Sequence, residues 1–441
     1  MKRSKATRSM MILFLFISSL LSAQTKVEDV KTFTLENGMK FFVLEDHSIP
    51  NANMYFFYKV GSRNEYPGIT GLSHFCEHMM FNGAKKYGPK MFDIVMEAAG
   101  GANNAYTNKD VTVYTDWFPS SSIETMFDLE ADRIGHLALA DKMVESERGG
   151  VLSERLTIYE NYNSALLSDQ VDAVAFMAHP YHWPVIGYES DIRNWKKSDL
   201  QRYFDTYYAP NNAVMVMAGD ITLEEVKPLV KKYFESIPSR EPPRPVHTEE
   251  PPQMGEKRIT VTKKVSSPHI MMAYHVPETR SEDYYALDIL SSILGDGNSS
   301  RLYRSIVSEK QLAVSIYAYM PEALDPTLFY IYAICARDVK VEDLEAAIYL
   351  EIDKVVNEGV TQQELQKVKN NKLVNFYRKM STINGKADSI GTYEIFFGSY
   401  KKLFDAPREY DKVTSGDIKT AAAKYLKKSN RTVGILKSKE E

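Results

Sequence analysis

An internal repeat limits the folds open to this chain more than any other feature. The segments SDLQRYFDTYYAPNNAVMVM and GDIKTAAAKYLKKSNRTVGI align without a gap, in a register that pairs Asp199 with Asp417, Tyr207 with Tyr425 and Asn212 with Asn430. Residues 237–256 lie between the two copies and contain six prolines. A proline-rich segment of this kind is stiff and extended. The sequence therefore predicts a duplicated unit, with one copy on each side of a linker.

Each copy mixes strand and helix patterns. The segment FTLENGMKFFVLED has alternating apolar residues on both sides of Asn37-Gly38, which is typical of a β-hairpin. The segment NNAVMVMAGDIT indicates a buried strand, and Thr222 with Glu225 has the spacing of a capping box that begins the next helix. We expect an α+β fold of two homologous domains, each a mostly antiparallel β-sheet packed with helices.

The predicted domain boundaries follow from the linker and the repeat. We expect an N-terminal domain over residues 24–236, a linker over 237–256 and a C-terminal domain over 257–441. Another capped helix is expected to begin near Ser198, with Gln201 three residues later. In the register of the repeat, His74 and His78 correspond to Ser292 and Asp296, so metal-binding residues are expected in the first copy alone.

The first 23 residues have the pattern of a secretory signal peptide. Four basic residues precede an apolar run over residues 10–21, and small residues follow, so cleavage is expected after Ala23. The run is shorter than the roughly 20 residues of a transmembrane helix. An uncleaved anchor remains the alternative. We expect an exported protein, periplasmic or secreted, with no stable membrane insertion after cleavage.

The charge of the remaining chain disfavours nucleic acid as a partner. Removing the four basic residues of the leader leaves 50 Lys and Arg against 58 Asp and Glu, a net charge of −8. Only two cysteines are present, and Cys76 lies inside the motif described next. A disulfide framework is therefore not expected, and a large apolar core must stabilise the fold.

Two histidines and a glutamate occur at helical spacing in the segment GLSHFCEHMMFNG, residues 71–83. His74 and His78 are four residues apart, which places both imidazoles on one face of a helix, as two ligands of one metal ion require. Glu77 projects near the same face and can act as a general base on a water molecule. The order H-x-x-E-H inverts the commoner zinc-protease motif and is itself a catalytic signature.

A second acidic helix is predicted downstream. The segment ESERGGVLSERLTIYE contains Glu147 and Glu154, seven residues apart, so the two carboxylates share one helical face. Taken singly, a glutamate in such a charged helix is usually a solvated side chain. A hydrolytic zinc site, however, needs a third protein ligand besides two histidines and keeps one position open.

Together these motifs resemble the pitrilysin and insulysin family of inverzincin metallopeptidases, which includes the mitochondrial processing peptidase. In this family H-x-x-E-H is followed farther along the chain by E-R-x-x-V-x-x-E, in the order and at the spacing found here. The resemblance implies a Zn²⁺ cofactor with His74, His78 and Glu154 as its ligands. It implies further that Glu77 is the general base and that Glu147 supports the site from behind the ligands.

The resemblance also assigns a substrate-binding strand. The family segment that matches residues 101–106 is an edge strand beside the zinc, where it pairs with the substrate backbone as an added β-strand. Gly101, Asn104 and Ala105 are the substrate-binding residues it implies here. The alternative is a plain hairpin with no role in binding. The histidines of the HPYHWPVIGY loop, His179 and His182, are interpreted as structural, because family members carry a similar loop that binds no metal.

One segment departs from the family pattern. In the segment that SSRLYRSIVSEKQLAVSIYA resembles, an Arg and a Tyr seven residues later reach the substrate, but Val307 and Val314 stand at those positions here. In heterodimeric members a zinc-less partner can supply this pair. We therefore expect a zinc-less homologous subunit as partner, or else a homodimer. The competing interpretation is that the two valines are core residues of a C-terminal domain that tolerates the loss.

The resemblance implies a secreted zinc-dependent endopeptidase. Its substrates would be short or unfolded polypeptides, held as an added strand in a chamber between two clam-shell halves. A non-catalytic or weakly catalytic peptide-binding subunit of a peptidase complex is the alternative function. The complete set of ligands and base argues against that alternative, since a decayed site usually loses one of them.

Overall fold

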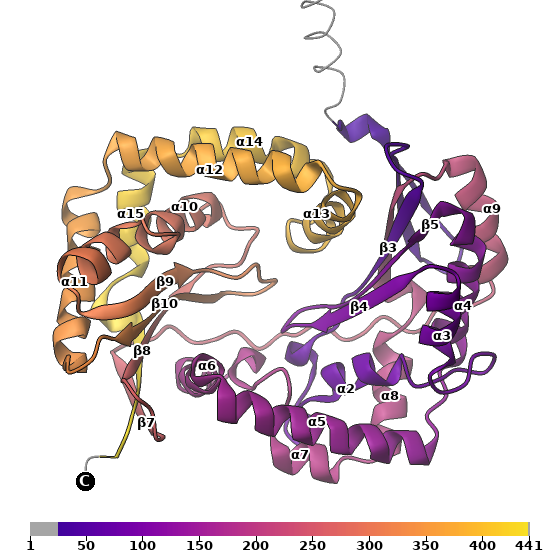
Figure 1. Ribbon diagram of the computed structural model, residues 1–441, viewed down its shortest axis with the longest axis horizontal. Helices are drawn as coiled ribbons and strands as arrows, with labels where there is room; N and C mark the ends of the chain where they lie inside the picture. Colours follow the sequence, from indigo (N-terminus) through magenta and orange to yellow (C-terminus); the bar gives the residue numbers. More distant parts are fainter. Residues whose placement is uncertain (1–24, 440–441) are drawn as a thin grey trace, which may run out of the picture.

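A computed structural model describes residues 25–439, so the predicted signal peptide lies outside the described residues. Within this range the chain forms two mostly antiparallel β-sheets, each packed with helices, in two domains (Figure 1). The predicted α+β class is confirmed. The exact domain boundaries given above remain predictions.

Six strands make the first sheet, in the order β1-β2-β6-β3-β5-β4, and five make the second, in the order β7-β11-β8-β10-β9. The strands are β1 (Val30–Thr34), β2 (Lys40–Glu45), β3 (Asn51–Tyr58), β4 (Ala102–Thr107), β5 (Thr112–Pro119), β6 (Ala213–Gly219), β7 (Lys257–Thr262), β8 (His269–Val276), β9 (Ala313–Tyr319), β10 (Thr327–Cys335) and β11 (Arg431–Lys437).

The helices of the first half are α2 (Leu72–Met79), α3 (Met91–Ala98), α4 (Ile123–His136), α5 (Asp141–Asn161), α6 (Asn163–Ala175), α7 (Glu189–Asn194), α8 (Lys197–Tyr207) and α9 (Leu223–Phe234). Those of the second half are α10 (Tyr284–Gly295), α11 (Val341–Glu358), α12 (Gln362–Met380), α13 (Ile383–Phe396), α14 (Lys401–Lys412) and α15 (Ser415–Tyr425). Short helical turns are η1 (Val27–Asp29), η2 (Ser62–Asn64), η3 (Ser120–Ser122), η4 (Pro180–His182), η5 (Pro210–Asn212), η7 (Lys428–Asn430) and the π-helix Tyr303–Glu309.

The two sheets share one topology. In each, the first strand of the unit pairs in parallel with the last, as β2 does with β6 and β7 with β11, and the next three pairings are antiparallel. Strands β6 and β11 begin at residues 213 and 431, and helices α8 and α15 begin at 197 and 415. The two strands and the two helices are separated by the same number of residues. This is also the separation between the two copies of the predicted repeat. Strand β1 is the addition that distinguishes the first sheet.

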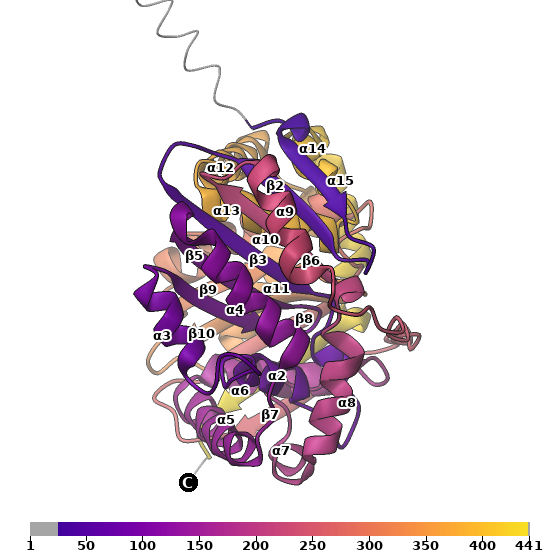
Figure 2. The same cartoon turned by 90° about the vertical axis from the view of Figure 1, so that its right-hand side faces the viewer.

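Each half sends one helix across to cover the sheet of the other half. Helix α13, from the second half, packs its apolar residues on the face of the first sheet that carries Phe42, Phe57 and Val216. Helix α6, from the first half, packs in turn on the second sheet against Met271 and Tyr330. The remaining faces are covered within each half, and α4 and α9 lie across the outer face of the first sheet (Figure 2). This exchange joins the halves through apolar cores.

A glycine makes the α13 contact close. A Cβ atom built on Gly391 would lie 2.0 Å from the ring of Phe57, which is fully buried on β3. Only a residue without a side chain lets the helix and the sheet approach to this distance. Helix α13 of the second half therefore packs directly on the first sheet, which borders the candidate site.

Helix capping confirms one prediction and corrects another. The Thr222 hydroxyl accepts the Glu225 N–H while the Glu225 carboxylate accepts the Thr222 N–H, so α9 begins with the predicted capping box. Helix α8 begins at Lys197, close to the predicted start near Ser198, but its N-cap is Lys196, so the predicted cap by Ser198 and Gln201 is wrong. The Lys196 N–H donates to Asp199 there, and a first-turn carboxylate suits the positive end of a helix.

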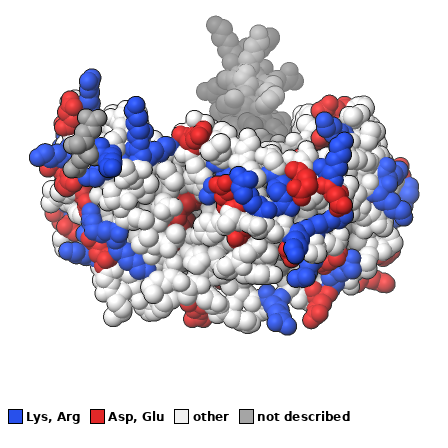
Figure 3. Space-filling view, turned by 90° about the horizontal axis from the view of Figure 1, so that it is seen from below, with Lys and Arg blue, Asp and Glu red and all other residues white. Residues whose placement is uncertain are grey.

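On the face drawn in Figure 3, acidic and basic side chains are interspersed, so no charge of one sign dominates that face. Among residues 25–439, no helix is long and apolar enough to cross a membrane. Cys76 and Cys335 are both free and buried, as expected for a fold stabilised by its core.

Candidate metal centre

Helix α2 is fixed in place by a buried carboxylate at its beginning. Gly71, with a positive φ of 91°, leads into the helix, and its N–H and that of Ser73 donate to the two oxygens of Glu65 at 2.7 Å each. These bonds satisfy backbone donors that a helix N-terminus leaves unpaired. Phe75 and Cys76 face the core from the same helix. Phe75 and Cys76 thus hold α2 against the core, and the histidines lie on its half-buried side.

The two histidines meet Glu154 of α5 at a single point. The Nε2 atoms of His74 and His78 are 3.3 Å apart, and the Glu154 Oε2 atom lies 3.8 Å and 3.5 Å from them, respectively. These three atoms form the one group found among the described residues that could hold a metal ion. In a tetrahedral zinc site with bonds of about 2.0–2.1 Å, ligand atoms lie about 3.3–3.4 Å apart. The spacing of the three atoms thus fits zinc.

The chemistry of the donor set also fits zinc. Burial, with the nearby His78 adding to it, lowers the pKa of His74 to about 3, so its ring is neutral at physiological pH. A neutral imidazole is the form that binds a metal. Two histidine nitrogens and one carboxylate oxygen are the set that hydrolytic zinc sites use, with one position left open.

Glu147 lies behind the histidine pair. Its Oε2 atom is 3.3 Å from the Nδ1 atom of His78, and it precedes Glu154 on the ligand-bearing side of α5. A carboxylate that accepts the second ring N–H of a histidine leaves the opposite nitrogen free to bind a metal. The contact agrees with the supporting role expected for Glu147.

Glu77 projects between α2 and β4. Its Oε2 atom accepts a hydrogen bond of 2.5 Å from the hydroxyl of Thr107, the last residue of β4. Burial raises the pKa of Glu77 above its ordinary value, and the bond from Thr107 offsets part of that rise. A carboxylate of raised pKa beside a metal site is suited to take up a proton and release it again.

A cleft with about 700 Å³ of open space joins this centre to the predicted substrate strand. Its walls include Glu77, His78 and Glu147 together with Asn104 and Ala105. Strand β4 is the last strand of the first sheet in order, so one of its edges carries no strand of that sheet. An extended peptide can pair along such an edge.

Gly101, Val307 and Val314 are not among the residues that line the cleft. Gly101 precedes β4 and packs against α3, where an added Cβ would lie 2.8 Å from the Met96 side chain. Val307 packs against the core of the second half, whereas Val314 is 59% exposed on β9, the last strand of the second sheet. One valine therefore has a structural role, and the other is an apolar side chain at a sheet edge.

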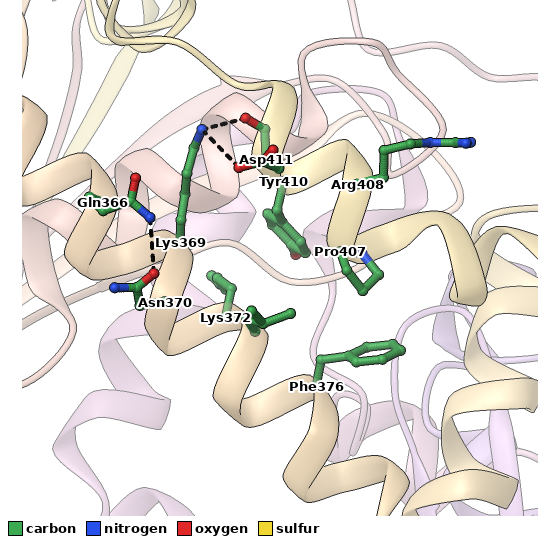
Figure 4. A pocket seen from close by; sticks show the side chains of 10 residues that line it. Gln366, Lys369, Asn370, Lys372, Phe376, Pro407, Arg408, Tyr410 and Asp411 are labelled. Atoms are coloured by element: carbon green, nitrogen blue, oxygen red, sulfur yellow. Dashed lines mark hydrogen bonds and ion pairs between the residues drawn. The ribbon is translucent and has the colours of Figure 1, made fainter. Parts of the chain in front are cut away.

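Cavities also exist away from the centre. The groove between α12 and α14 holds about 790 Å³ of open space (Figure 4). Its polar groups are largely satisfied by one another, since Lys369 binds Asp411 and the Gln366 amide donates to the Asn370 side chain at 2.9 Å. None of the predicted site residues lines this groove.

A polar network that joins the two halves escaped sequence analysis. The Tyr181 hydroxyl lies 2.7 Å from Asp110, and Arg63 pairs with both Asp110 and Asp325 of the second half. His179, interpreted as structural, contacts Asp325 at 3.1 Å. The only sequence signal was the cluster of polar residues in the segment TNKDV and the HPYHW loop, which does not show that they meet.

Comparison with known proteins agrees with this geometry. The family model described as "Insulinase (Peptidase family M16)" matches residues 41–188, a range that contains both histidines, Glu77 and Glu154. The model described as "Peptidase M16 inactive domain" matches residues 194–372, which contain none of these four. The chain is 30% identical over 438 residues to the Helicobacter pylori "Zinc protease PqqE", covering 97% of each protein.

Solved structures extend the comparison. A crystal structure described as a protease from Helicobacter pylori has a TM-score of 0.90 and 29% identity, covering 92% of this chain and 99% of that one. The periplasmic protease PqqL from Escherichia coli has a TM-score of 0.77 at 18% identity and shares the fold, with 95% of this chain matching 48% of that one. By sequence and by fold, the chain belongs to the insulinase family of peptidases, peptidase family M16.

Proposed function

We propose that the chain is an exported, zinc-dependent endopeptidase that hydrolyses peptide bonds in short or unfolded polypeptides and acts with a partner subunit. The observation that carries the proposal is that ligand atoms of His74, His78 and Glu154 lie within 4.8 Å of one another, with Glu77 and His78 on the wall of one cleft. Relatives named zinc proteases support the same assignment.

His74, His78 and Glu154 would hold Zn²⁺, which when bound would supply Lewis-acid activation of water and of the scissile carbonyl. The work of the protein's own residues follows from their positions. The Glu77 carboxylate accepts a proton from the attacking water and passes it to the leaving amine. Strand β4 orients the substrate by backbone pairing, with Asn104 and Ala105 on the cleft wall.

A substrate that pairs with a sheet edge must present an extended backbone. Peptides and unfolded segments offer this, and the paired backbone of a folded protein does not. The substrate class we propose is therefore flexible polypeptide. Export is supported by the leader pattern of residues 1–23, and the fold is also that of a protein described as periplasmic.

The partner subunit is proposed from two observations. Val314 places an exposed apolar side chain at the edge of the second sheet, where the family pattern has a tyrosine. The Escherichia coli structure shows that this two-domain fold also occurs as about half of a longer chain. A second two-domain subunit, zinc-less and homologous, would supply the missing Arg and Tyr.

The chelation test is hydrolysis of an internally quenched, unstructured peptide by the zinc-loaded chain. Turnover is expected to fall at least about 100-fold on chelation and to return on zinc addition, because the open coordination position activates water. If the loaded chain is inactive alone, a zinc-less relative from the same organism is expected to restore turnover.

The proposal would be contradicted if the zinc-loaded chain binds the peptide but does not cleave it, either alone or together with such a relative. The chain would then be a peptide-binding subunit.

A further inference from the structure

The hydroxyl of Thr107 holds the carboxylate of Glu77, and nothing in the assigned motifs accounts for this contact. We propose that Thr107 is a positioning residue, which fixes Glu77 so that Oε1 is the oxygen that receives the proton from water. The inference rests on the proposed function, in which Glu77 is the general base. The carrying observation is the bond of 2.5 Å from Thr107 Oγ1 to Glu77 Oε2.

The direction of this hydrogen bond is set by its surroundings. Thr107 pairs with Thr112 across the β4–β5 hairpin, and their hydroxyl oxygens are 3.3 Å apart. Thr112, fully buried, donates its own proton to the Val60 carbonyl at 3.0 Å. Thr112 can therefore only accept from Thr107, at 3.3 Å, whereas the Glu77 carboxylate accepts at 2.5 Å. The single proton of Thr107 goes to the nearer, charged acceptor, because a charge-assisted bond of this kind is among the stronger ones.

The hairpin that carries Thr107 is anchored on both sides of its turn. The Asn108 side chain accepts the N–H groups of Asp110 and Val111 at 2.8 Å each, which closes the turn. The backbone N–H groups of Ser62 and Arg63 donate to the turn carbonyls of residues 108 and 109. The turn is thus bound to the segment that leads into the metal helix.

Close packing beneath the turn leaves it little freedom to shift. A Cβ atom on Gly61 would lie 2.4 Å from the Asn108 carbonyl oxygen, so the two backbones approach as closely as a glycine permits. A hydroxyl carried on so constrained a turn can define the position of its partner to within a fraction of an ångström.

The second half of the chain adds a further anchor. The buried carboxylate of Asp110 accepts the Tyr181 hydroxyl at 2.7 Å and the backbone N–H of Leu324 at 3.3 Å. Leu324 lies between β9 and β10, on the far side of the linker. The position of the base is thereby tied to the docking of the two halves.

The consequence for catalysis concerns orientation. With Oε2 bound to Thr107, rotation of the Glu77 carboxylate breaks a hydrogen bond, so Oε1 keeps one direction. Displacement of a reacting group by about 1 Å can lower a rate by about 100-fold. Substrate binding along β4 uses backbone groups and does not require the Thr107 hydroxyl.

The test compares Thr107→Val, which removes the hydroxyl and keeps the shape, with Thr107→Ser, which restores the hydroxyl. All variants are made in the full chain, loaded with zinc and, if turnover requires it, combined with the partner. For Thr107→Val we expect kcat to fall about 10- to 100-fold with KM within about twofold. Thr107→Ser should recover kcat to within about threefold. Thr206→Val, at a threonine whose hydroxyl bonds back to its own helix α8, is the matched control and should be unchanged.

A second readout separates this proposal from the proposed function. Crystal structures of the zinc-loaded variants should show the Glu77 carboxylate in place in the wild type and in Thr107→Ser, and turned away in Thr107→Val. Unchanged kcat in Thr107→Val, or failure of serine to restore it, would overturn the proposal. If the wild type cleaves no peptide, the proposed function fails. Whatever the activity, a Glu77 carboxylate that keeps its position in Thr107→Val would refute the positioning role.

Discussion

Replacing Glu77 by glutamine is expected to abolish nearly all peptide hydrolysis while leaving zinc bound. Glutamine has the shape of glutamate, and its amide oxygen can still accept the Thr107 hydroxyl. It cannot take up a proton at neutral pH, so the step that deprotonates water loses its base. General-base catalysis is worth about 10²- to 10⁴-fold, and kcat should fall within this range.

The measurement pairs turnover of a quenched peptide with metal analysis of the same sample. Zinc should remain at one per chain, because Glu77 is not one of the three proposed ligands His74, His78 and Glu154. Glu97→Gln removes an exposed carboxylate from the neighbouring helix α3 and is expected to leave kcat unchanged. A Glu77→Gln enzyme that keeps most of its activity would show that another group is the base.

Replacing Glu154 by glutamine should have a different effect, namely loss of the bound zinc. A neutral amide is a weak zinc ligand, and removing the carboxylate leaves two histidines to bind the ion. We expect zinc affinity to fall more than about 100-fold and turnover to disappear at limiting zinc. Glu147→Gln alters only the partner of His78, and a loss of about 10- to 100-fold in affinity is expected.

Competition with a chromophoric chelator measures both affinities. The matched control is Glu145→Gln, on the same helix, where the carboxylate pairs with Arg148 and is largely exposed. Its zinc affinity should equal that of the wild type. Equal affinities for the Glu154 and Glu145 variants would remove Glu154 from the set of ligands.

The parts of this site that the sequence could predict are local or periodic. His74, Glu77 and His78 lie within about one helical turn, so their common direction follows from helix geometry alone. The constant separation between the two repeat copies likewise identified equivalent elements, since both copies obey the same pattern of strands and helices. In each case the information lies in the spacing.

The parts it could not predict depend on long-range packing. Thr107 lies 30 residues from Glu77, and Leu324 lies 214 residues from Asp110, so no periodicity relates them. The exchange of α6 and α13 between the halves is similarly hidden, because an apolar helical face does not show which sheet it will cover. The N-cap of α8 was misplaced by two residues for a local reason, since the Ser198 and Gln201 pattern overlaps the Lys196 and Asp199 pair that caps the helix.

The central claim is that His74, His78 and Glu154 bind one zinc ion, and anomalous diffraction at the zinc edge tests it most directly. Crystals of the chain grown with zinc should show one strong peak about 2.0–2.2 Å from both histidine Nε2 atoms and from a Glu154 carboxylate oxygen. A peak bound elsewhere, or none at these three atoms, would contradict the account of the metal centre and of the chemistry built on it.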